Sequence, residues 1–172
     1  ACTGDYSVLL SRYPVRCIAF EPVPENYTTI MRNLHLNRLT GKVDAYKTGL
    51  GNKNMKARFN FNPVNTGASH IDSLNSTGGC EVEICTFDSL LNELKIDVRE
   101  KILFKLDVEG MEPEALEGCT QFIRQYPNIM FVMEEKHAGQ DRIKTILNKI
   151  AVFEYGIVDE FNIYARKITN LN

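Results

Sequence analysis

The sequence predicts an α/β fold built on a doubly wound, mostly parallel sheet. Short apolar runs, typical of strands buried on both faces, alternate along the chain with segments whose apolar residues recur at helical spacing. Two of these runs, Cys17 to Phe20 and Ile102 to Leu106, are followed at once by the acids Glu21 and Asp107. Because parallel strands deliver such residues to one edge of a sheet, the pattern is typical of α/β enzymes.

Length and charge restrict the classes of protein that fit. The chain has 172 residues, of which 44% are hydrophobic, so it can bury one core but hardly two. We therefore expect a single domain over residues 1–172. Its 20 basic and 22 acidic residues give a net charge of -2, which argues against a nucleic-acid partner.

Cysteine use and hydropathy favour a cytoplasmic protein. Five cysteines form an odd set without a C-x-x-C pair, which favours reduced thiols over a disulfide framework or a zinc site. No apolar run approaches the roughly 18 residues that a membrane helix needs, so we expect no membrane partner. The sequence leaves the oligomeric state open.

Residue spacing in the first half predicts alternating helices and strands. In order, these are a helix at residues 7–13, a strand at 15–20, a helix at 24–37, a strand at 42–47 and an antiparallel strand at 55–61. The helix at 24–37 carries Tyr27, Ile30, Met31 and Leu34 on one face. The polar residues 62–79 exceed an ordinary connection and form either a functional lid or a surface loop.

The second half continues this alternation and ends in an antiparallel pair. We expect strands at residues 80–87, 102–107 and 128–133, helices at 112–125 and 140–150, and a final strand pair at 152–157 and 161–165. A further helix carries Leu90, Leu91 and Leu94, and Asp88 is placed to cap it.

Two motifs together resemble a known family. The string A-F-E-P-x-P-x-N begins at Ala19, and K-L-D-V-E-G-x-E begins at Lys105. Their order and spacing resemble the FkbM-type S-adenosylmethionine-dependent methyltransferases. The resemblance implies the Rossmann-like, seven-stranded sheet of class I methyltransferases, in which the last strand is antiparallel to its neighbours. It also implies S-adenosylmethionine as the cofactor.

The opening residues carry a further expectation from this resemblance. In the family, a string such as ACTGDYS follows directly on the first strand of the sheet and its glycine. We therefore expect upstream residues that carry this strand. Without it, the strands at 15–20 and 102–107 would lack their shared neighbour.

The cofactor site is predicted from one turn and one strand end. Gly4 lies in a small-residue turn, and Glu21 ends the following strand, where an acid can accept hydrogen bonds from ribose hydroxyls. A turn glycine and a surface glutamate would explain the same residues. The resemblance implies that Glu21 binds the ribose and that Pro22 borders the adenosine.

The turn at residues 48–51 is the second predicted part of the cofactor site. The resemblance implies that Gly49 and Leu50 line the pocket, with Leu50 presenting an apolar face to the adenine. The alternative is that Gly49 and Gly51 serve only the geometry of the backbone.

Methyl transfer depends on positioning and on removal of the acceptor's proton. We name Asp107, Glu134 and His137 as catalytic candidates, because each lies at or just beyond a predicted strand end. Asp107 is the first choice, near the acceptor or the methionine part of the cofactor. The alternatives are that Asp107 caps the next helix and that His137 is simply solvated.

Other polar residues near these strand ends are weaker candidates. Glu135 follows Glu134, whereas Glu109 and Glu112 lie where a helix dipole favours acids regardless of function. His70 could reach an acceptor only if residues 62–79 fold over the site. Asp107, Glu109 and Glu134 could also bind Mg²⁺, but the resemblance does not require a metal and we expect none.

These observations predict an O-methyltransferase that acts on a hydroxyl of a small molecule, such as a sugar or a polyketide-like acceptor. A nicotinamide-dependent oxidoreductase is the first alternative, because an acid at the second strand end suits that cofactor too. A non-catalytic nucleoside-binding module is the second, because no motif fixes the catalytic base.

Overall fold

The chain forms two compact units, which are described separately. The computed structural model describes residues 1–60, 70–72, 79–108, 110–134 and 140–171. The first unit comprises Ala1–Gly49 and Asn54–Ile84, and the second comprises Leu50–Lys53 and Cys85–Asn172. The single domain expected over residues 1–172 stays a prediction. No helix in the described ranges is long and apolar enough to cross a bilayer.

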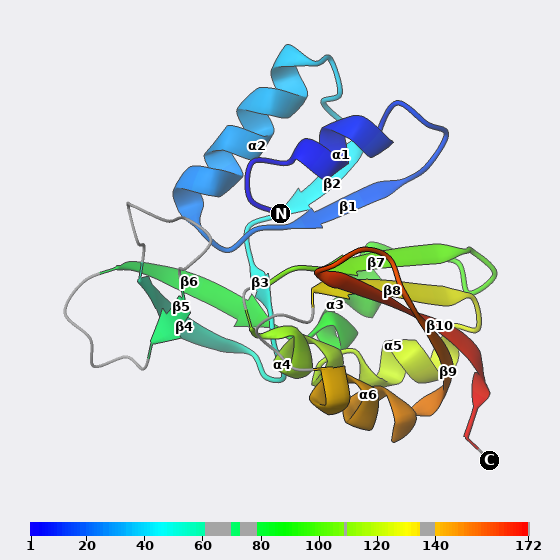
Figure 1. Cartoon of the computed structure of the whole chain (residues 1–172). Helices are drawn as coiled ribbons and strands as arrows, with labels where there is room; N and C mark the ends of the chain where they lie inside the picture. Colours follow the sequence, from blue (N-terminus) through cyan, green and yellow to red (C-terminus); the bar gives the residue numbers. More distant parts are fainter. Residues whose placement is uncertain (61–69, 73–78, 109, 135–139, 172) are drawn as a thin grey trace. The chain divides into compact units, whose positions relative to one another are not determined.

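A two-stranded parallel sheet with two helices opens the first unit (Figure 1). The sheet pairs β1 (Cys17–Phe20) with β2 (Val43–Tyr46), and the helices are α1 (Asp5–Leu10) and α2 (Pro24–Leu36). Helix α2 begins at Pro24, where a missing backbone N–H costs nothing. Its buried Ile30 and Leu34 pack on the sheet, so the predicted helix at 24–37 is confirmed.

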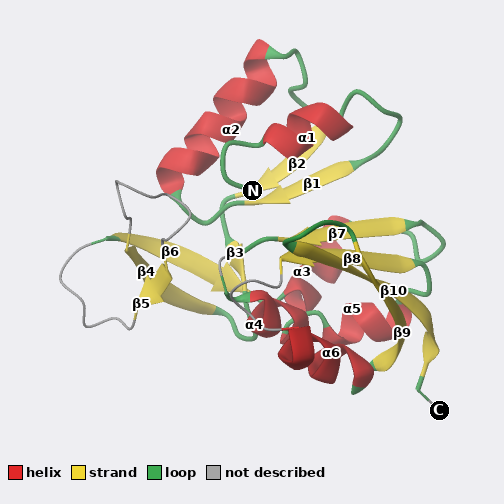
Figure 2. Cartoon of the chain, viewed as in Figure 1, coloured by secondary structure: helices red, strands yellow, loops and turns green. Residues whose placement is uncertain are grey.

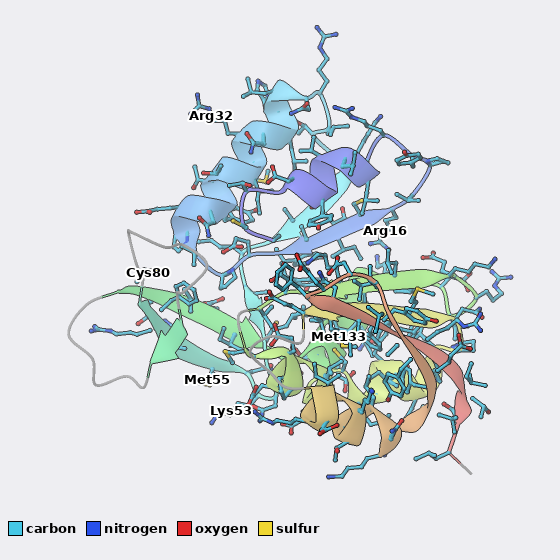
Figure 3. The ribbon with its side chains drawn as sticks, in the orientation of Figure 1. Arg16, Arg32, Lys53, Met55, Cys80 and Met133 are labelled. Carbon is cyan, nitrogen blue, oxygen red and sulfur yellow. The ribbon has the colours of Figure 1, made fainter. Side chains whose placement is uncertain are left out.

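Ion pairing supports the register of this small sheet. Arg16, labelled in Figure 3, precedes β1 and lies 3.0 Å from Asp44 of β2 (Nη2 to Oδ2). Both side chains are half-exposed, so the pair adds little stability.

The second sheet of the first unit is antiparallel around β4. Its strand order is β3 (Gly49–Leu50), β6 (Cys80–Cys85), β4 (Met55–Asn60) and β5 (His70–Asp72). Buried Ala57, Val82 and Ile84 form its core. The predicted antiparallel strand at 55–61 is confirmed. Most of residues 62–79 lie outside the described residues, but His70–Asp72 form a strand, so the lid remains untested.

The second unit is built on a mixed four-stranded sheet. Its order is β7 (Ile102–Leu106), β8 (Ile129–Glu134), β10 (Asn162–Asn170) and β9 (Ala151–Ile157). Strands β7 and β8 are parallel, whereas β10 is antiparallel to both β8 and β9. Figure 2 shows the helices of this unit along one face of the sheet. They are α3 (Phe87–Leu94), α4 (Glu112–Glu117), α5 (Thr120–Gln125) and α6 (Gln140–Asn148).

The prediction of a mostly parallel, doubly wound sheet is not confirmed. The chain is α/β, but the strands of its described residues form three sheets, with parallel pairs in two of them and antiparallel pairs in two. The antiparallel last strand is confirmed by β10. Within the described residues, β1 pairs with β2 and β7 with β8, so each lies at the end of its sheet.

The single helix predicted at 112–125 is wrong, because the chain forms α4 and α5 instead. The break falls at Gly118 and Cys119. A Cβ on Gly118 would lie 2.0 Å from the carbonyl oxygen of Gly51, so the backbone of this turn packs directly against another segment. The periodicity of the helix itself carries no sign of that contact.

Helix α5 is short, and side chains from two other elements satisfy its ends. Asp88 of α3 accepts hydrogen bonds from the N–H groups of Gln121 (2.7 Å) and Phe122 (2.8 Å). Asp88 was predicted to cap its own helix, which is wrong: the hydroxyl of Thr86 caps α3. At the other end, the buried ammonium of Lys167 donates to the carbonyls of Ile123 and Tyr126.

Candidate active site

Glu21 is a buried acid held by its own chain. It follows β1, and only 5% of its surface is exposed. Oε2 accepts from the amino group of Ala1 (3.0 Å) and from the N–H of Cys2 (2.7 Å). Oε1 accepts from the N–H of Val23 (3.0 Å) and from Nδ2 of Asn26 (3.3 Å). The alternative of a surface glutamate is therefore wrong.

This bonding determines what Glu21 can do for a ligand. A carboxylate has about four lone-pair sites, and the N–H groups of Cys2 and Val23 and the side-chain amide of Asn26 occupy three of them. A ribose hydroxyl can therefore bind Glu21 at the remaining site or by replacing one of these donors. The fit to a nucleoside diol is chemically sound, because the exchange replaces one hydrogen bond with another.

Gly4 shapes the loop that also reaches Glu21. Its φ of 83° lies in the left-handed region, and its N–H donates to the carbonyl of Ala1 at 3.0 Å. A Cβ there would approach Ile30 to 3.2 Å. Gly4 thus lies at the start of α1 and Glu21 at the end of β1, both in the first unit, and their binding of a cofactor stays a prediction.

The predicted turn at residues 48–51 is partly a strand. Gly49 and Leu50 form β3, and both are buried. A Cβ on Gly49 would lie 2.6 Å from Ile84 and 3.3 Å from Pro22, so close packing explains this glycine. Contacts of Pro22 and Leu50 with a cofactor stay predictions.

Asp107 and Glu134 lie side by side in the second unit. The parallel register pairs Leu106 with Met133, so the two acids occupy matching positions at the carboxyl ends of β7 and β8. Met133, labelled in Figure 3, is fully buried and fixes this part of β8 in the core. Neighbouring strands are about 4.8 Å apart, which places both carboxylates within reach of one small molecule.

Lys105 is a residue of this site that the sequence analysis missed. Its ammonium lies 2.7 Å from Oδ2 of Asp107, whose side chain is 45% exposed. The signal was present, because residues two apart on a strand share a face. The capping alternative for Asp107 is not supported, since Met111 occupies the N-cap of α4 and this helix has no side-chain cap.

Glu112 holds the turn that follows Asp107. It is 1% exposed, and its Oε1 accepts from the N–H of Val108 at 2.9 Å. Its Oε2 has no hydrogen-bond partner among the described residues. Gly110 in the same turn has a φ of 96°. The hydrogen bond from Val108 to Glu112 thus ties the residue after Asp107 to the start of α4.

Strand β10 adds a third polar position beside the two acids. Its register pairs Asn162 with Glu134. Asp159 accepts from Nδ2 of Asn162, and this bond, the N–H groups of Phe161 and Asn162 and the charge of Lys105 together lower the pKa of Asp159. Sequence analysis missed both residues because the pairing of β10 with β8 is not visible in periodicity.

Several predicted residues cannot be placed. Glu109, Glu135 and His137 lie outside the described residues. His70 lies in strand β5, and its side chain is outside the description. Glu21 and Asp107 belong to different units, so their place at one edge of a common sheet stays a prediction. In the described parts of the chain, no group of three or more His, Cys, Asp or Glu is arranged to hold a metal ion.

Comparisons with known proteins agree with the motifs. The sequence model of the methyltransferase FkbM domain matches residues 5–161. The chain is 28% identical to the hexuronic acid methyltransferase AglP of Haloferax volcanii, over 72% of this chain and 48% of that protein. It is 29% identical to methyltransferase 1 of Beauveria bassiana, over 67% of this chain and 54% of that protein.

A solved structure supports the fold in the same way. The methyltransferase FkbM of Methylobacillus flagellatus KT aligns with a TM-score of 0.65 at 15% identity, covering 96% of this chain and 41% of that one. At this identity the likeness concerns the fold alone. The chain spans about half the length of the curated relatives that it matches.

Proposed function

Because this chain belongs to the methyltransferase FkbM domain family, we propose that it transfers a methyl group from S-adenosylmethionine to a hydroxyl oxygen of a small molecule. The acceptor is a sugar or a polyketide-like compound. The observation that carries the proposal is the family match, which contains both acid-ended motifs within residues 5–161. A cytoplasmic location belongs to the same proposal and rests on the cysteine pattern.

The cofactor would be held through its ribose by Glu21. Burial of this carboxylate and its position at the end of β1 support that role. Gly4 would let the loop approach the nucleoside, Pro22 would border the adenosine, and Leu50 with Gly49 would provide the apolar wall beside the adenine. S-adenosylmethionine supplies an electrophilic methyl group on a cationic sulfur.

The acceptor hydroxyl must lose a proton as the new C–O bond forms. Asp107 and Glu134 are the carboxylates available at the ends of β7 and β8, and either can take that proton. Lys105 orients Asp107 through their ion pair. Because Asp107 is half-exposed, it can exchange water for an acceptor without an energetic barrier from burial.

A sugar acceptor is favoured by one relative. The archaeal protein named above is a hexuronic acid methyltransferase. Paired carboxylates also suit carbohydrate hydroxyls, because each carboxylate can accept two hydrogen bonds from neighbouring hydroxyl groups. His137 remains a candidate for the base in this proposal, in competition with the two acids.

Calorimetry with S-adenosylhomocysteine tests the cofactor assignment. The wild-type chain should bind, and Glu21→Ala should weaken binding at least tenfold, because a buried charged acceptor is lost. Glu25→Ala is the control, since Glu25 is an exposed acid only four residues away. Tight NADH binding in place of S-adenosylhomocysteine would contradict the proposal. Binding without methyl transfer to any of a broad panel of hydroxyl compounds would indicate a non-catalytic module.

A further inference from the structure

The turn of the β9–β10 hairpin exposes an unusual amount of apolar surface. Ile157 is 78% exposed, Val158 52% and Phe161 45%. We call these three residues the hairpin tip. Three exposed apolar side chains thus lie within five residues of one turn, and exposed apolar surface of this kind can mark a binding surface.

The register of the sheet places the hairpin tip beside the candidate catalytic acids. Asn162, the first residue of β10, pairs with Glu134 of β8. Leu106 of β7 pairs with Met133 of β8, so Asp107, the residue after Leu106, lies beside Glu134 on the strand next to β8. The tip therefore lies at the same edge of the sheet as both acids, about two strand spacings from Asp107.

The hairpin tip is held in one conformation by hydrogen bonds. Asp159 Oδ1 accepts from the N–H groups of Phe161 and Asn162, each at 2.9 Å, and from Nδ2 of Asn162. The N–H of Val158 donates to the carbonyl of Asn162 at 2.9 Å. Because the turn is already ordered, contact with a ligand loses little conformational entropy.

We infer that the hairpin tip selects the methyl acceptor, and that it favours acceptors carrying an alkyl or aryl group next to the hydroxyl-bearing ring. The inference rests on the proposed function. Asp107, Glu134 and Asn162 form a polar row suited to hydroxyl groups, and the apolar tip adjoins the end of that row. An acceptor that is polar on one side and apolar on the other matches this arrangement.

The test compares two glucosides that differ only in the length of the alkyl group. Octyl β-D-glucopyranoside, kept below its micelle concentration, and methyl β-D-glucopyranoside are titrated into the chain in the presence of S-adenosylhomocysteine. Octyl glucoside should bind about tenfold more tightly, as burial of two methylene groups would give. The double variant Ile157→Thr with Val158→Thr should lose most of that preference.

The other end of the same hairpin provides a matched control. Val152 is 42% exposed and Ile168 53%, so Val152→Thr with Ile168→Thr makes the same two chemical changes away from the acids. This control should keep the preference for octyl glucoside. Equal binding of the two glucosides, binding of neither, or an equal loss in the control would overturn the inference.

A second measurement separates this inference from the proposed function. S-adenosylhomocysteine binding and methyl transfer are measured on the same proteins. A chain that neither binds S-adenosylhomocysteine nor transfers a methyl group, but still binds octyl glucoside more tightly than methyl glucoside, would reject the proposed function. The same result would support an apolar ligand site at the hairpin tip. Methyl transfer that is intact and indifferent to the alkyl group would reject the tip and keep the function.

Discussion

At the scale of single residues, the two motif acids have different physical roles. Glu21 is buried and accepts several hydrogen bonds from its own chain, whereas Asp107 is half-exposed and paired with one lysine. A buried carboxylate held by several hydrogen bonds is suited to fixed recognition. An exposed carboxylate with one flexible partner can exchange that partner for a reacting group, so Asp107 is the better candidate for proton transfer.

Replacing Asp107 with Asn keeps the shape of the side chain and removes its charge. Turnover, followed with a labelled methyl donor and a panel of hydroxyl acceptors, should fall about 10²-fold or more. The melting temperature should change little, because the lost ion pair is exposed to solvent. Asp97→Asn, which also breaks an exposed ion pair, should leave turnover unchanged. Full activity in Asp107→Asn would remove Asp107 from the mechanism.

Tyr155 gives a prediction about pH. Burial raises the pKa of Tyr155 to about 12, and its hydroxyl donates to Oδ1 of Asn148 at 2.8 Å. The unfolded phenol ionises near pH 10, so unfolding releases a proton between the two values. The free energy of unfolding should therefore fall as the pH rises from about 10 to about 12.

Absorbance at 295 nm checks this pKa directly. The chain has seven tyrosines, and a late phase near pH 12 should disappear in Tyr155→Phe. If the titration curve of Tyr155→Phe loses amplitude near pH 10 instead, the phenol of Tyr155 is not shielded in the native protein.

At the scale of elements, helix α5 depends on its neighbours. Six residues are too few for a stable isolated helix, so its ends must be satisfied by tertiary contacts. Asp88 supplies the acceptor at one end and Lys167 the donor at the other. The hydrogen bonds to Asp88 and from Lys167 hold α5 in place, and with it Phe122, whose ring contacts Phe87 and Phe104.

Removing the cap at Asp88 should destabilise the second unit. Asp88→Ala leaves two N–H groups of α5 without their acceptor and should lower the free energy of unfolding by about 1–2 kcal/mol. Thr86→Ala removes one cap bond from α3 and should cost about 1 kcal/mol. Urea denaturation measures both values. A larger loss in Thr86→Ala would mean that α5 does not depend on Asp88.

The contact between Gly118 and Gly51 predicts a larger effect. Gly118 has ordinary helical dihedral angles, so only space forbids a side chain there. Gly118→Ala should destabilise the chain by about 3 kcal/mol, because the clash is with backbone rather than with a flexible side chain. Gly41→Ala is the comparison, since Gly41 has a φ of 81° and open space around its Cα.

The two variants separate steric from conformational cost. Gly41→Ala should lose only about 1 kcal/mol, the usual penalty for alanine in a left-handed turn. Thermal unfolding would measure both changes. Equal effects would show that the segment carrying Gly51 moves away from Gly118 at little cost.

At the scale of the whole molecule, the sequence predicted what depends on local pattern. The strands that end at Phe20 and Leu106 were found because their apolar runs and the acids that follow are contiguous. The division of the 112–125 helix was missed, and the contact of its break with Gly51 joins segments that are distant in sequence. Asn162 became visible as a site residue only through strand register, whereas Lys105 could have been found from its spacing of two residues from Asp107 on the predicted strand.

The same distinction explains the outcome for the fold. Alternating helices and strands predicted an α/β protein, which is confirmed, but which strands pair depends on contacts that no local pattern encodes. The antiparallel pairing of β10 with β9 was predicted from residue spacing, its antiparallel orientation to other neighbours was expected only through the family resemblance, and β5 was not predicted at all. The placement of Glu21 and Asp107 at one edge of a common sheet also depends on strand pairing, and it stays a prediction.

The hydrogen bonding of Glu21 has a kinetic consequence. Under the proposed function, a nucleoside that displaces the N–H of Cys2 from this carboxylate can bind only after this hydrogen bond has broken, so opening of the loop precedes capture. Stopped-flow traces should then show an observed rate that levels off at high nucleoside concentration instead of rising linearly. The plateau would report how often the loop opens, a property set by the chain and independent of the ligand.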